Sequence, residues 1–305
     1  MLRRTATLGG WVATTTRASF APATLERTPS AVTLVASRSH QTAARRDAPP
    51  VGQVDVREKA KFEADAALWW NEREGPFAAL HGMNPTRVAF IRDAMRRKLA
   101  VGGEVGMERS LEGLRVCDVG CGGGILAESL ARLGAQVTAI DAGPANIAIA
   151  RAHAALDPSL RDSLKYEAVT AEELVDRGER FDVVTSLEVI EHVTDPLEFT
   201  KSIASLVKSN GSLFISTINR TARSFMGAIL AAERVFGVVP PGTHEFSKFL
   251  TPGEIAMMAK RGGCEMDELA GMVYNPLRNK WTLSSDTQIN FIAHCVKSND
   301  ATATK

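Results

Sequence analysis

The sequence predicts an α/β fold in which a mostly parallel sheet is covered by helices on both faces. Between residues 114 and 219, runs of branched residues alternate with helix-like patterns, an order typical of parallel strands joined by crossover helices. Two further strand candidates, 265–273 and 288–296, follow without a full helix between them. We therefore expect these two to form an antiparallel hairpin at the edge of the sheet.

Local signals justify each element in turn. Strands are predicted where branched apolar residues recur, at 114–119, 135–141, 164–169, 181–186 and 212–219. Helices are predicted where apolar residues return every three or four positions, at 126–134, at 144–156, from Asp195-Pro196 to before Asn210-Gly211, and from the capping box Thr251–Glu254 to Gly262-Gly263. Ahead of the sheet, 56–71 is predicted to be an amphipathic helix whose Trp69 and Trp70 either pack in the core or cover a ligand.

Composition divides the 305 residues into a basic leader and a nearly neutral body. The first fifty residues hold seven arginines and two acids, a pattern typical of a mitochondrial transit peptide, although an ordinary disordered terminus remains an alternative. We expect a catalytic domain at 55–298 and a tail at 299–305. The remainder carries a net charge of about −4, which argues against nucleic acid as a partner. The four cysteines contain no C-x-x-C pair, so no zinc site or disulfide framework is indicated.

A glycine-rich loop, D-x-G-x-G-x-G from Asp118 to Gly124, follows the first strand of the sheet. A dinucleotide fingerprint would require glycine or alanine where Ile125 stands, and no Gly-Lys-Ser/Thr of a phosphate loop follows. Asp141 ends the next strand, where an acid can accept both ribose hydroxyls of an adenosine. Because Asp118 suits an ammonium group, and Gly120 and Gly122 bring backbone N–H groups close to a carboxylate, the loop points to S-adenosylmethionine.

A second cluster, Glu188, Glu191 and His192, follows the fourth strand at the edge where such sheets bind ligands. In a helical turn the three side chains can project to one side and hold a divalent cation such as Mg²⁺ or Zn²⁺. The alternative is that they line the pocket or cap the helix, in which case His192 or Glu188 is a candidate general base. The Asn/Asp-Pro-Pro-aromatic turn of amino-methylating enzymes of nucleic acids is absent here.

Several segments in order carry a family resemblance: ALWWNEREGPFAALHGMNPTRVAFI, DVGCGGGILAESLARLGAQVTAID, SLEVIEHVTDP, TINR, PPGTHEFSKFLTPGE and YNPLRNKW. Together, over about residues 58–297, they resemble the O-methyltransferases of ubiquinone biosynthesis, within the class I S-adenosylmethionine-dependent methyltransferases. The resemblance implies a seven-stranded sheet with a C-terminal antiparallel hairpin. It also implies a polyprenyl-dihydroxybenzoate or demethylubiquinol substrate, a catechol ring with an isoprenoid tail.

By the same resemblance, S-adenosylmethionine would contact Arg87, Gly120, Asp141 and Leu187, and Glu188, Glu191 and His192 would be metal ligands in the mitochondrial members. Arg87 would hold the methionine carboxylate, although from the sequence alone it could be a surface or capping residue. We expect direct in-line methyl transfer, with a metal-bound catechol oxygen as the nucleophile. His244, in the segment PPGTHEF, is a further candidate base or pocket residue.

An insertion at 220–250 exceeds what a minimal methyltransferase core needs. Phe225, Ile229 and Phe236 lie on one face of a predicted helix whose apolar stretch, about 22 Å long, is shorter than the roughly 30 Å of a bilayer core. The helix therefore either lies in a membrane interface, with arginines toward anionic headgroups, or packs on the sheet. The family implies peripheral contact with the matrix side of the mitochondrial inner membrane, within a multi-enzyme complex.

Two other functions fit the same motifs. One is a methyltransferase for another acceptor, either a small molecule or a protein. The other is a non-catalytic mitochondrial assembly subunit that keeps the fold. Loss of the loop glycines or of the ribose-binding acid would favour the second function, and Gly120, Gly122, Gly124 and Asp141 are all present.

Overall fold

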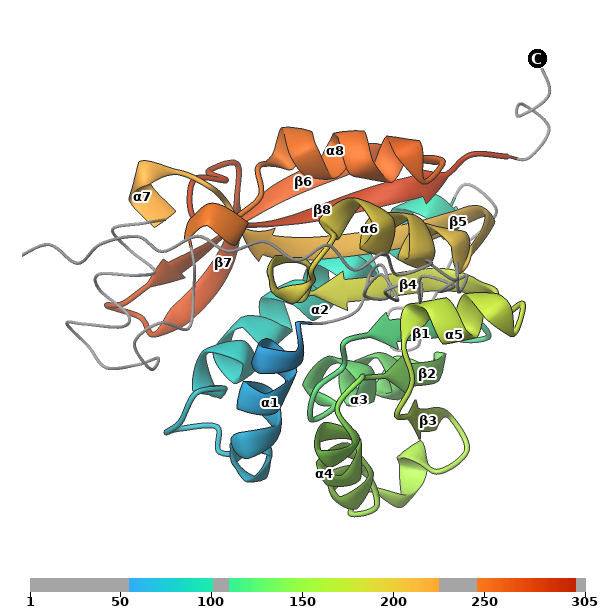
Figure 1. The fold of residues 1–305 in the computed structure, drawn as a ribbon, viewed down its shortest axis with the longest axis vertical. Helices are drawn as coiled ribbons and strands as arrows, with labels where there is room; N and C mark the ends of the chain where they lie inside the picture. Colours follow the sequence, from blue (N-terminus) through green and yellow to red (C-terminus); the bar gives the residue numbers. More distant parts are fainter. Residues whose placement is uncertain (1–54, 101–109, 225–245, 300–305) are drawn as a thin grey trace, which may run out of the picture. The chain divides into compact units, whose positions relative to one another are not determined.

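The predicted strands lie side by side in an eight-stranded sheet with helices on both faces (Figure 1). The computed structural model describes residues 55–100, 110–224 and 246–299, all of which belong to the unit that spans 47–305. The leader at 1–50 and most of the insertion lie outside the described residues. Within them, the strand order is β3-β2-β1-β4-β5-β8-β6-β7.

The strands match most of the predicted runs. They are β1 Arg115–Val119, β2 Gln136–Ile140, β3 Leu164–Glu167, β4 Phe181–Leu187, β5 Val207–Ile218, β6 Cys264–Asn275, β7 Lys280–Ser284 and β8 Asn290–Lys297. The first five pair in parallel, and β8 pairs antiparallel with both β5 and β6. The α/β class and the C-terminal hairpin are confirmed, while β7 adds an eighth strand to the expected seven.

The helices are α1 Val56–Ala64, α2 Ala78–Ala100, α3 Ile125–Arg132, α4 Pro144–Ala154, α5 Ala171–Asp176, α6 Pro196–Ser205, α7 Ala222–Ser224 and α8 Pro252–Arg261. Short 3₁₀ turns are η1 Ala66–Leu68, η2 Pro158–Leu160, η3 Ile190–His192 and η5 Phe246–Lys248. The capping box predicted at Thr251 is present, since its side chain accepts from the Glu254 N–H. The helix predicted at 56–71 ends early, at Ala64.

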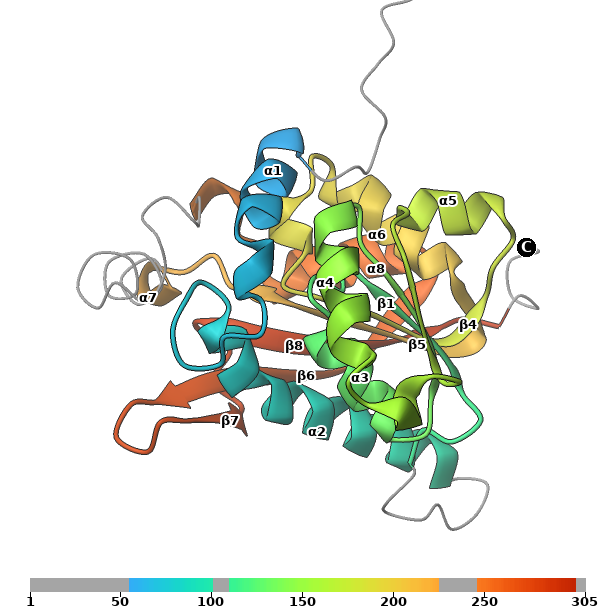
Figure 2. The same cartoon turned by 90° about the horizontal axis from the view of Figure 1, so that it is seen from below.

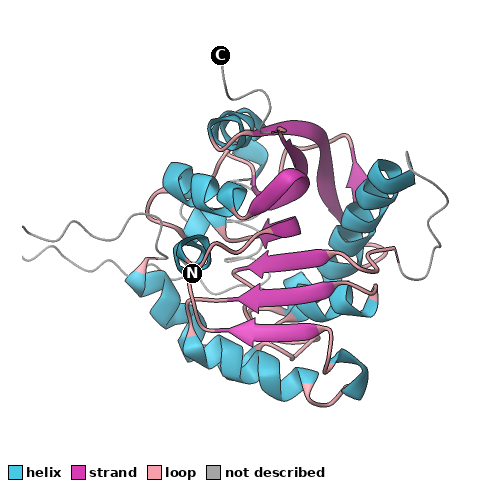
Figure 3. Ribbon diagram, turned by 90° about the vertical axis from the view of Figure 1, so that its right-hand side faces the viewer, coloured by secondary structure: helices cyan, strands magenta, loops and turns pink. Residues whose placement is uncertain are grey.

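Two apolar cores lie on opposite faces of the sheet, beneath the helices that surround the strands in Figure 3. One core packs α5, α6 and α8 on the sheet, and the other packs α2, α3 and α4. A third, small cluster joins the segment after α1 to the start of α3 through Trp69, Phe77 and Ile125. No helix in the described part of the chain is long and apolar enough to cross a membrane.

Candidate active site

A cavity lies where β1, β2 and β4 end, the edge of the sheet at which open α/β folds bind ligands. Its lining includes all six residues that the sequence predicts to contact S-adenosylmethionine, namely Arg87, Asp118, Gly120, Gly122, Asp141 and Leu187. Residues from the N-terminal segment, Phe62 and Trp69 among them, line it as well. The fold thus brings the predicted donor-binding residues together from four separate stretches of chain.

The glycine loop between β1 and α3 is crowded by an indole ring. Gly122 has a φ of +51°, and a Cβ there would lie 2.3 Å from Trp69. Trp69 cannot retreat easily, because its Nε1 donates to Asn146 Oδ1 over 2.9 Å and its ring stacks on Phe77 with centroids 3.7 Å apart. Backbone conformation and close approach therefore both require glycine at this position.

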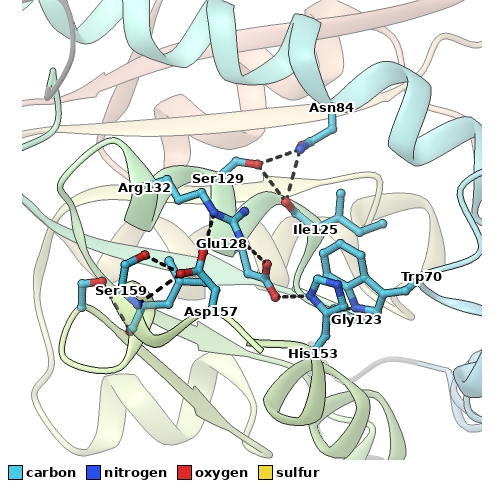
Figure 4. A network of polar contacts seen from close by, with 12 residues as sticks. Trp70, Asn84, Gly123, Ile125, Glu128, Ser129, Arg132, His153, Asp157 and Ser159 are labelled. Atoms are coloured by element: carbon cyan, nitrogen blue, oxygen red, sulfur yellow. Dashed lines mark hydrogen bonds and ion pairs between the residues drawn. The ribbon is translucent and has the colours of Figure 1, made fainter. Parts of the chain in front are cut away.

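The second tryptophan ties the loop to a buried polar network (Figure 4). Trp70 Nε1 donates to the carbonyl of Gly123 over 3.0 Å, and its ring lies parallel to His153 with centroids 3.3 Å apart. His153 Nδ1 lies 2.7 Å from Glu128 Oε1, and Arg132 donates to the other oxygen of this fully buried carboxylate over 2.9 Å. The network joins α3, α4 and the N-terminal segment. Trp69 is buried and lines the cavity, whereas Trp70 is half-buried and packs beside the loop.

Asp118 and Arg87 place opposite charges beside the loop. Asp118 Oδ1 accepts from the Thr185 hydroxyl over 2.7 Å, whereas buried Oδ2 has no hydrogen-bond partner among the described residues. Burial raises the pKa of Asp118 to about 6, against the lowering effects of Thr185 and Arg87. Arg87 is buried too, and its Nε is likewise unpaired in the described chain. These unpaired groups match an ammonium and a carboxylate on one ligand.

Asp141 closes the loop from the end of β2. One carboxylate oxygen accepts from the Gly122 N–H over 3.0 Å, and the other accepts from the Gly143 N–H over 2.7 Å. Asn146 donates to this second oxygen over 3.1 Å. These bonds orient the carboxylate at the edge of the cavity, where it can still accept a diol, because each oxygen has more than one lone pair.

The second predicted cluster is only partly assembled at the cavity. Glu188, at a φ of +58°, and His192 line it, whereas Glu191 does not. Glu188 Oε1 accepts from the Ser216 hydroxyl over 2.7 Å. His192 Nδ1 lies 3.2 Å from Glu58 of α1. The three residues do not share one regular helical turn, because Glu188 has a left-handed backbone and only Glu191 and His192 belong to η3.

The electrostatics of this cluster are set by burial and like charge. Burial, together with the charge of Glu188, raises the pKa of Glu191 to about 7 against the lowering effect of His192. Burial alone would lower the pKa of His192, but hydrogen bonding with Glu58 raises it overall. In the described chain Glu191 Oε2 has no hydrogen-bond partner, and no three His, Cys, Asp or Glu side chains form a group that could hold a metal.

The inserted segment is described only at its two flanks. His244 and the predicted amphipathic helix fall at 225–245, outside the described residues. Arg220 pairs with Glu254, and Arg223 lies 3.4 Å from Asp286, so both arginines have acidic partners within the protein.

Comparisons with known proteins place this geometry in a family. A family model described as "Methyltransferase domain" matches residues 88–269. The mitochondrial ubiquinone biosynthesis O-methyltransferase of Arabidopsis thaliana is 47% identical over 243 residues, 80% of this chain and 74% of the relative. That of Azorhizobium caulinodans is 45% identical over 238 residues, 78% of this chain and 92% of the relative. The chain belongs to the ubiquinone biosynthesis O-methyltransferases. It is an S-adenosylmethionine-dependent O-methyltransferase, as its sequence motifs predict.

Solved structures support the fold of this O-methyltransferase. Magnesium protoporphyrin IX methyltransferase from Synechocystis PCC 6803, solved with bound SAH, matches with a TM-score of 0.54 at 20% identity. The match covers 79% of this chain and 98% of that chain. A sarcosine dimethylglycine methyltransferase from Galdieria sulphuraria, described as putative, gives a TM-score of 0.51 at 12% identity, over 78% and 99% of the two chains. At these identities the likeness concerns the class I fold alone.

Sequence reasoning missed several residues that shape this O-methyltransferase site. Thr185 and Ser216 hold the carboxylates of Asp118 and Glu188, and Asn146 holds Trp69. Glu58 reaches His192 from a helix more than a hundred positions earlier. Hydroxyls on buried strands are a weak signal, but their places near the carboxyl ends of β4 and β5 could have suggested them.

Proposed function

We propose that this enzyme transfers the methyl group of S-adenosylmethionine to a catechol-type hydroxyl of polyprenyl-dihydroxybenzoate, demethylubiquinol or both. The observation that carries the proposal is that one cavity is lined both by Arg87, Asp118 and Asp141 and by Glu188 and His192. The first three residues suit the donor, and the last two suit an acidic hydroxyl. The names of the relatives support the pathway.

In this proposal the protein acts mainly by holding the two reactants in line. Arg87 binds the methionine carboxylate, the unpaired Oδ2 of Asp118 accepts from the ammonium, and Asp141 accepts from the ribose hydroxyls. The backbone of Leu187 and of the glycine loop completes the donor site. Alignment of two bound reactants can lower a barrier by about 7–11 kcal/mol, so little further chemistry is required.

A divalent cation, Mg²⁺ or Zn²⁺, would be held by Glu188, Glu191 and His192. The chemical types of these ligands suit such a cation. Glu191 is a buried carboxylate with an unpaired oxygen, and a cation would neutralise its charge and that of the nearby Glu188. The side chains of Glu188 and His192 would have to move to bind the cation together, because Glu188 accepts a hydrogen bond from Ser216 and His192 lies against Glu58. When bound, the ion would lower the pKa of a coordinated hydroxyl.

Without a cation, His192 is the stronger candidate base, and Glu188 the other. His192 lines the cavity, and Glu58 fixes its ring through Nδ1, an arrangement in which a carboxylate orients the imidazole. His244 stays a candidate of the undescribed segment. The two mechanisms differ in a simple way: one requires the Glu191 carboxylate to bind metal, and the other does not.

The names of the relatives and the composition of the leader support a cellular setting for this proposal. We place the enzyme in the mitochondrion, with residues 1–50 as transit peptide, 55–298 as catalytic domain and 299–305 as tail. The mitochondrial relative of Arabidopsis thaliana and the Arg-rich leader support this location. A polyprenylated substrate would require peripheral contact with the matrix side of the inner membrane, where partner enzymes of the pathway would assemble.

The test is transfer of a labelled methyl group from S-adenosylmethionine to a short-chain prenyl dihydroxybenzoate. Transfer to a ring hydroxyl supports the proposal. Binding of S-adenosylhomocysteine without transfer to this acceptor or to a demethylubiquinol analogue would contradict it, and would favour another acceptor or an assembly role.

The metal has its own test, independent of activity. Equilibrium dialysis with Mg²⁺ and Zn²⁺ should show one bound ion in the wild type and none in Glu191→Gln. Because Glu191 does not line the cavity, this variant should still bind S-adenosylhomocysteine. Equal metal binding by both proteins, or none by either, would exclude the Glu188, Glu191 and His192 site and leave the base mechanism.

A further inference from the structure

The hairpin formed by β6 and β7 projects past the rest of the sheet. Pairing of β8 with β5 ends at Ile218 with Asn290, and pairing of β8 with β6 ends at Met272. β6 continues to Asn275 and returns through β7, so residues 274–281, here called the hairpin tip, lie beyond the carboxyl end of β5 (Figure 2). This is the end of the sheet at which the cavity opens.

The hairpin tip is apolar at its apex and basic beside it. Leu277 is 96% exposed, more than any other exposed large apolar side chain of the described chain, and Tyr274 is 44% exposed. Arg278 and Lys280 are exposed next to Leu277, and residues 274–281 contain no acid. Removal of the Leu277 side chain from water by a partner would be favourable, and the two cations beside it would be left at the edge of the contact.

The exposure of Leu277 comes from an ordered turn. The side chain of Asn275 accepts from the Leu277 N–H over 3.0 Å and from the Arg278 N–H over 3.2 Å. Tyr274 donates to Asn279 over 2.7 Å, and its ring lies against that of Trp281 with centroids 5.4 Å apart. The Thr86 hydroxyl of α2 anchors the base by donating to the Trp281 carbonyl over 3.1 Å. The tip is therefore built to hold its leucine outward.

We propose that the hairpin tip docks on an anionic lipid surface, with Leu277 inserted below the headgroups. An apolar apex, two cations beside it and an aromatic pair at the base of the tip match the residue types that membrane interfaces favour. A protein partner would instead be expected to cover a broad apolar patch, which a single projecting residue does not offer. This inference rests on the proposed polyprenylated substrate, because docking here would turn the cavity end of the sheet toward the lipid that holds it.

The test uses an environment-sensitive thiol dye in the full chain. The four native cysteines are all buried, so a new exposed cysteine can be labelled selectively. Dye on Leu277→Cys should brighten and shift to the blue with vesicles of phosphatidylcholine and phosphatidylglycerol. Dye on Leu156→Cys, an equally simple change at a leucine that is 77% exposed after α4, should not respond. Because the dye reports its own surroundings, binding through the Arg-rich leader does not imitate the result.

Partition measurements give the expected size of the effect. Leu277→Gln should weaken vesicle binding about tenfold, and Leu156→Gln should leave it unchanged. Arg278→Gln with Lys280→Gln should weaken binding about twentyfold, and only when phosphatidylglycerol is present. An unresponsive dye at Leu277, or wild-type partition by Leu277→Gln, would overturn the proposal and leave the tip as a protein contact.

An activity measurement separates this inference from the proposed function. Leu277→Gln should methylate a water-soluble short-chain acceptor as fast as the wild type, and should turn over a long-chain acceptor in vesicles more slowly. Full turnover of the long-chain acceptor by Leu277→Gln would overturn the docking role. No turnover of either acceptor by the wild type would refute the proposed function, while the dye would still decide whether the tip enters lipid.

Discussion

Cofactor affinity should depend on pH through Asp118. Burial raises the pKa of this carboxyl to about 6 in the unliganded protein. Only the ionised form can pair with an ammonium, so acidification below this pKa must weaken binding. The ionised fraction falls from about nine tenths at pH 7 to about one tenth at pH 5, which predicts about tenfold weaker binding, or about 1.4 kcal/mol.

Calorimetric titration with S-adenosylhomocysteine between pH 5 and pH 8 measures this dependence directly. Asp118→Asn should bind more weakly at every pH and show no decline between pH 7 and pH 5. Thr185→Val removes the hydroxyl that lowers the pKa of Asp118, so its affinity should decline at a higher pH than that of the wild type. A wild-type affinity that stays constant down to pH 5, or a decline that persists in Asp118→Asn, would refute the assignment of Asp118 to the ammonium.

Three further predictions concern the loop, the tryptophan network and the back of the sheet. Gly122→Ala should lower the unfolding free energy, measured in urea, by about 3 kcal/mol, because alanine disfavours the left-handed φ and its Cβ would clash with Trp69. The control Gly113→Ala also has a positive φ but meets no neighbour, so it should lower the unfolding free energy by only about 1 kcal/mol. Trp70→Phe keeps the stack on His153 but loses the hydrogen bond that holds the glycine loop at Gly123, so S-adenosylhomocysteine should bind about fivefold more weakly. Unchanged affinity would show that this hydrogen bond does not hold the loop for the ligand. Burial and nearby Lys98 lower the pKa of His294 to about 4, so protonation favours the unfolded chain and stability is lost as pH falls from about 6.5. Between pH 7 and pH 4.5 the unfolding free energy of the wild type, measured in urea, should fall by about 2 kcal/mol more than that of His294→Gln. Equal pH dependence of the unfolding free energy in the two proteins would argue against the lowered pKa of His294.

The positions of the parallel strands along the chain could be predicted because buried parallel strands are continuous apolar runs between recognisable turns. β7 escaped prediction because Lys280–Ser284 lies at the edge and exposes most of its side chains, which removes the apolar signal. The long helix α2 also escaped, since it contains Pro85 and many charged residues. The short α5 does carry a signal, a capping box between Thr170 and Glu173.

The residues expected to bind the donor meet at the cavity, whereas those expected to bind a metal are only partly assembled there, and the difference has a physical reason. Gly120, Gly122 and Asp141 are placed by backbone geometry and strand ends, which local sequence determines. The placement of Glu188, Glu191 and His192 depends on the left-handed backbone at Glu188 and on partners from α1 and β5. Such long-range contacts leave no spacing in the sequence, so residue type predicted a cluster and could not predict its arrangement.

The charges around the cavity give the site a preference for a cationic donor. Its charged lining consists of four carboxylates, Asp118, Asp141, Glu172 and Glu188, with Lys59, Arg87 and His192, and burial raises the pKa of Asp118, Asp141 and Glu188. A cavity with more carboxylates than cations must take up either protons or positive charge from its ligand. S-adenosylmethionine supplies positive charge through its sulfonium and ammonium groups. Methyl transfer removes the sulfonium charge, so the same carboxylates hold the product less strongly than the donor, which favours exchange after each turnover.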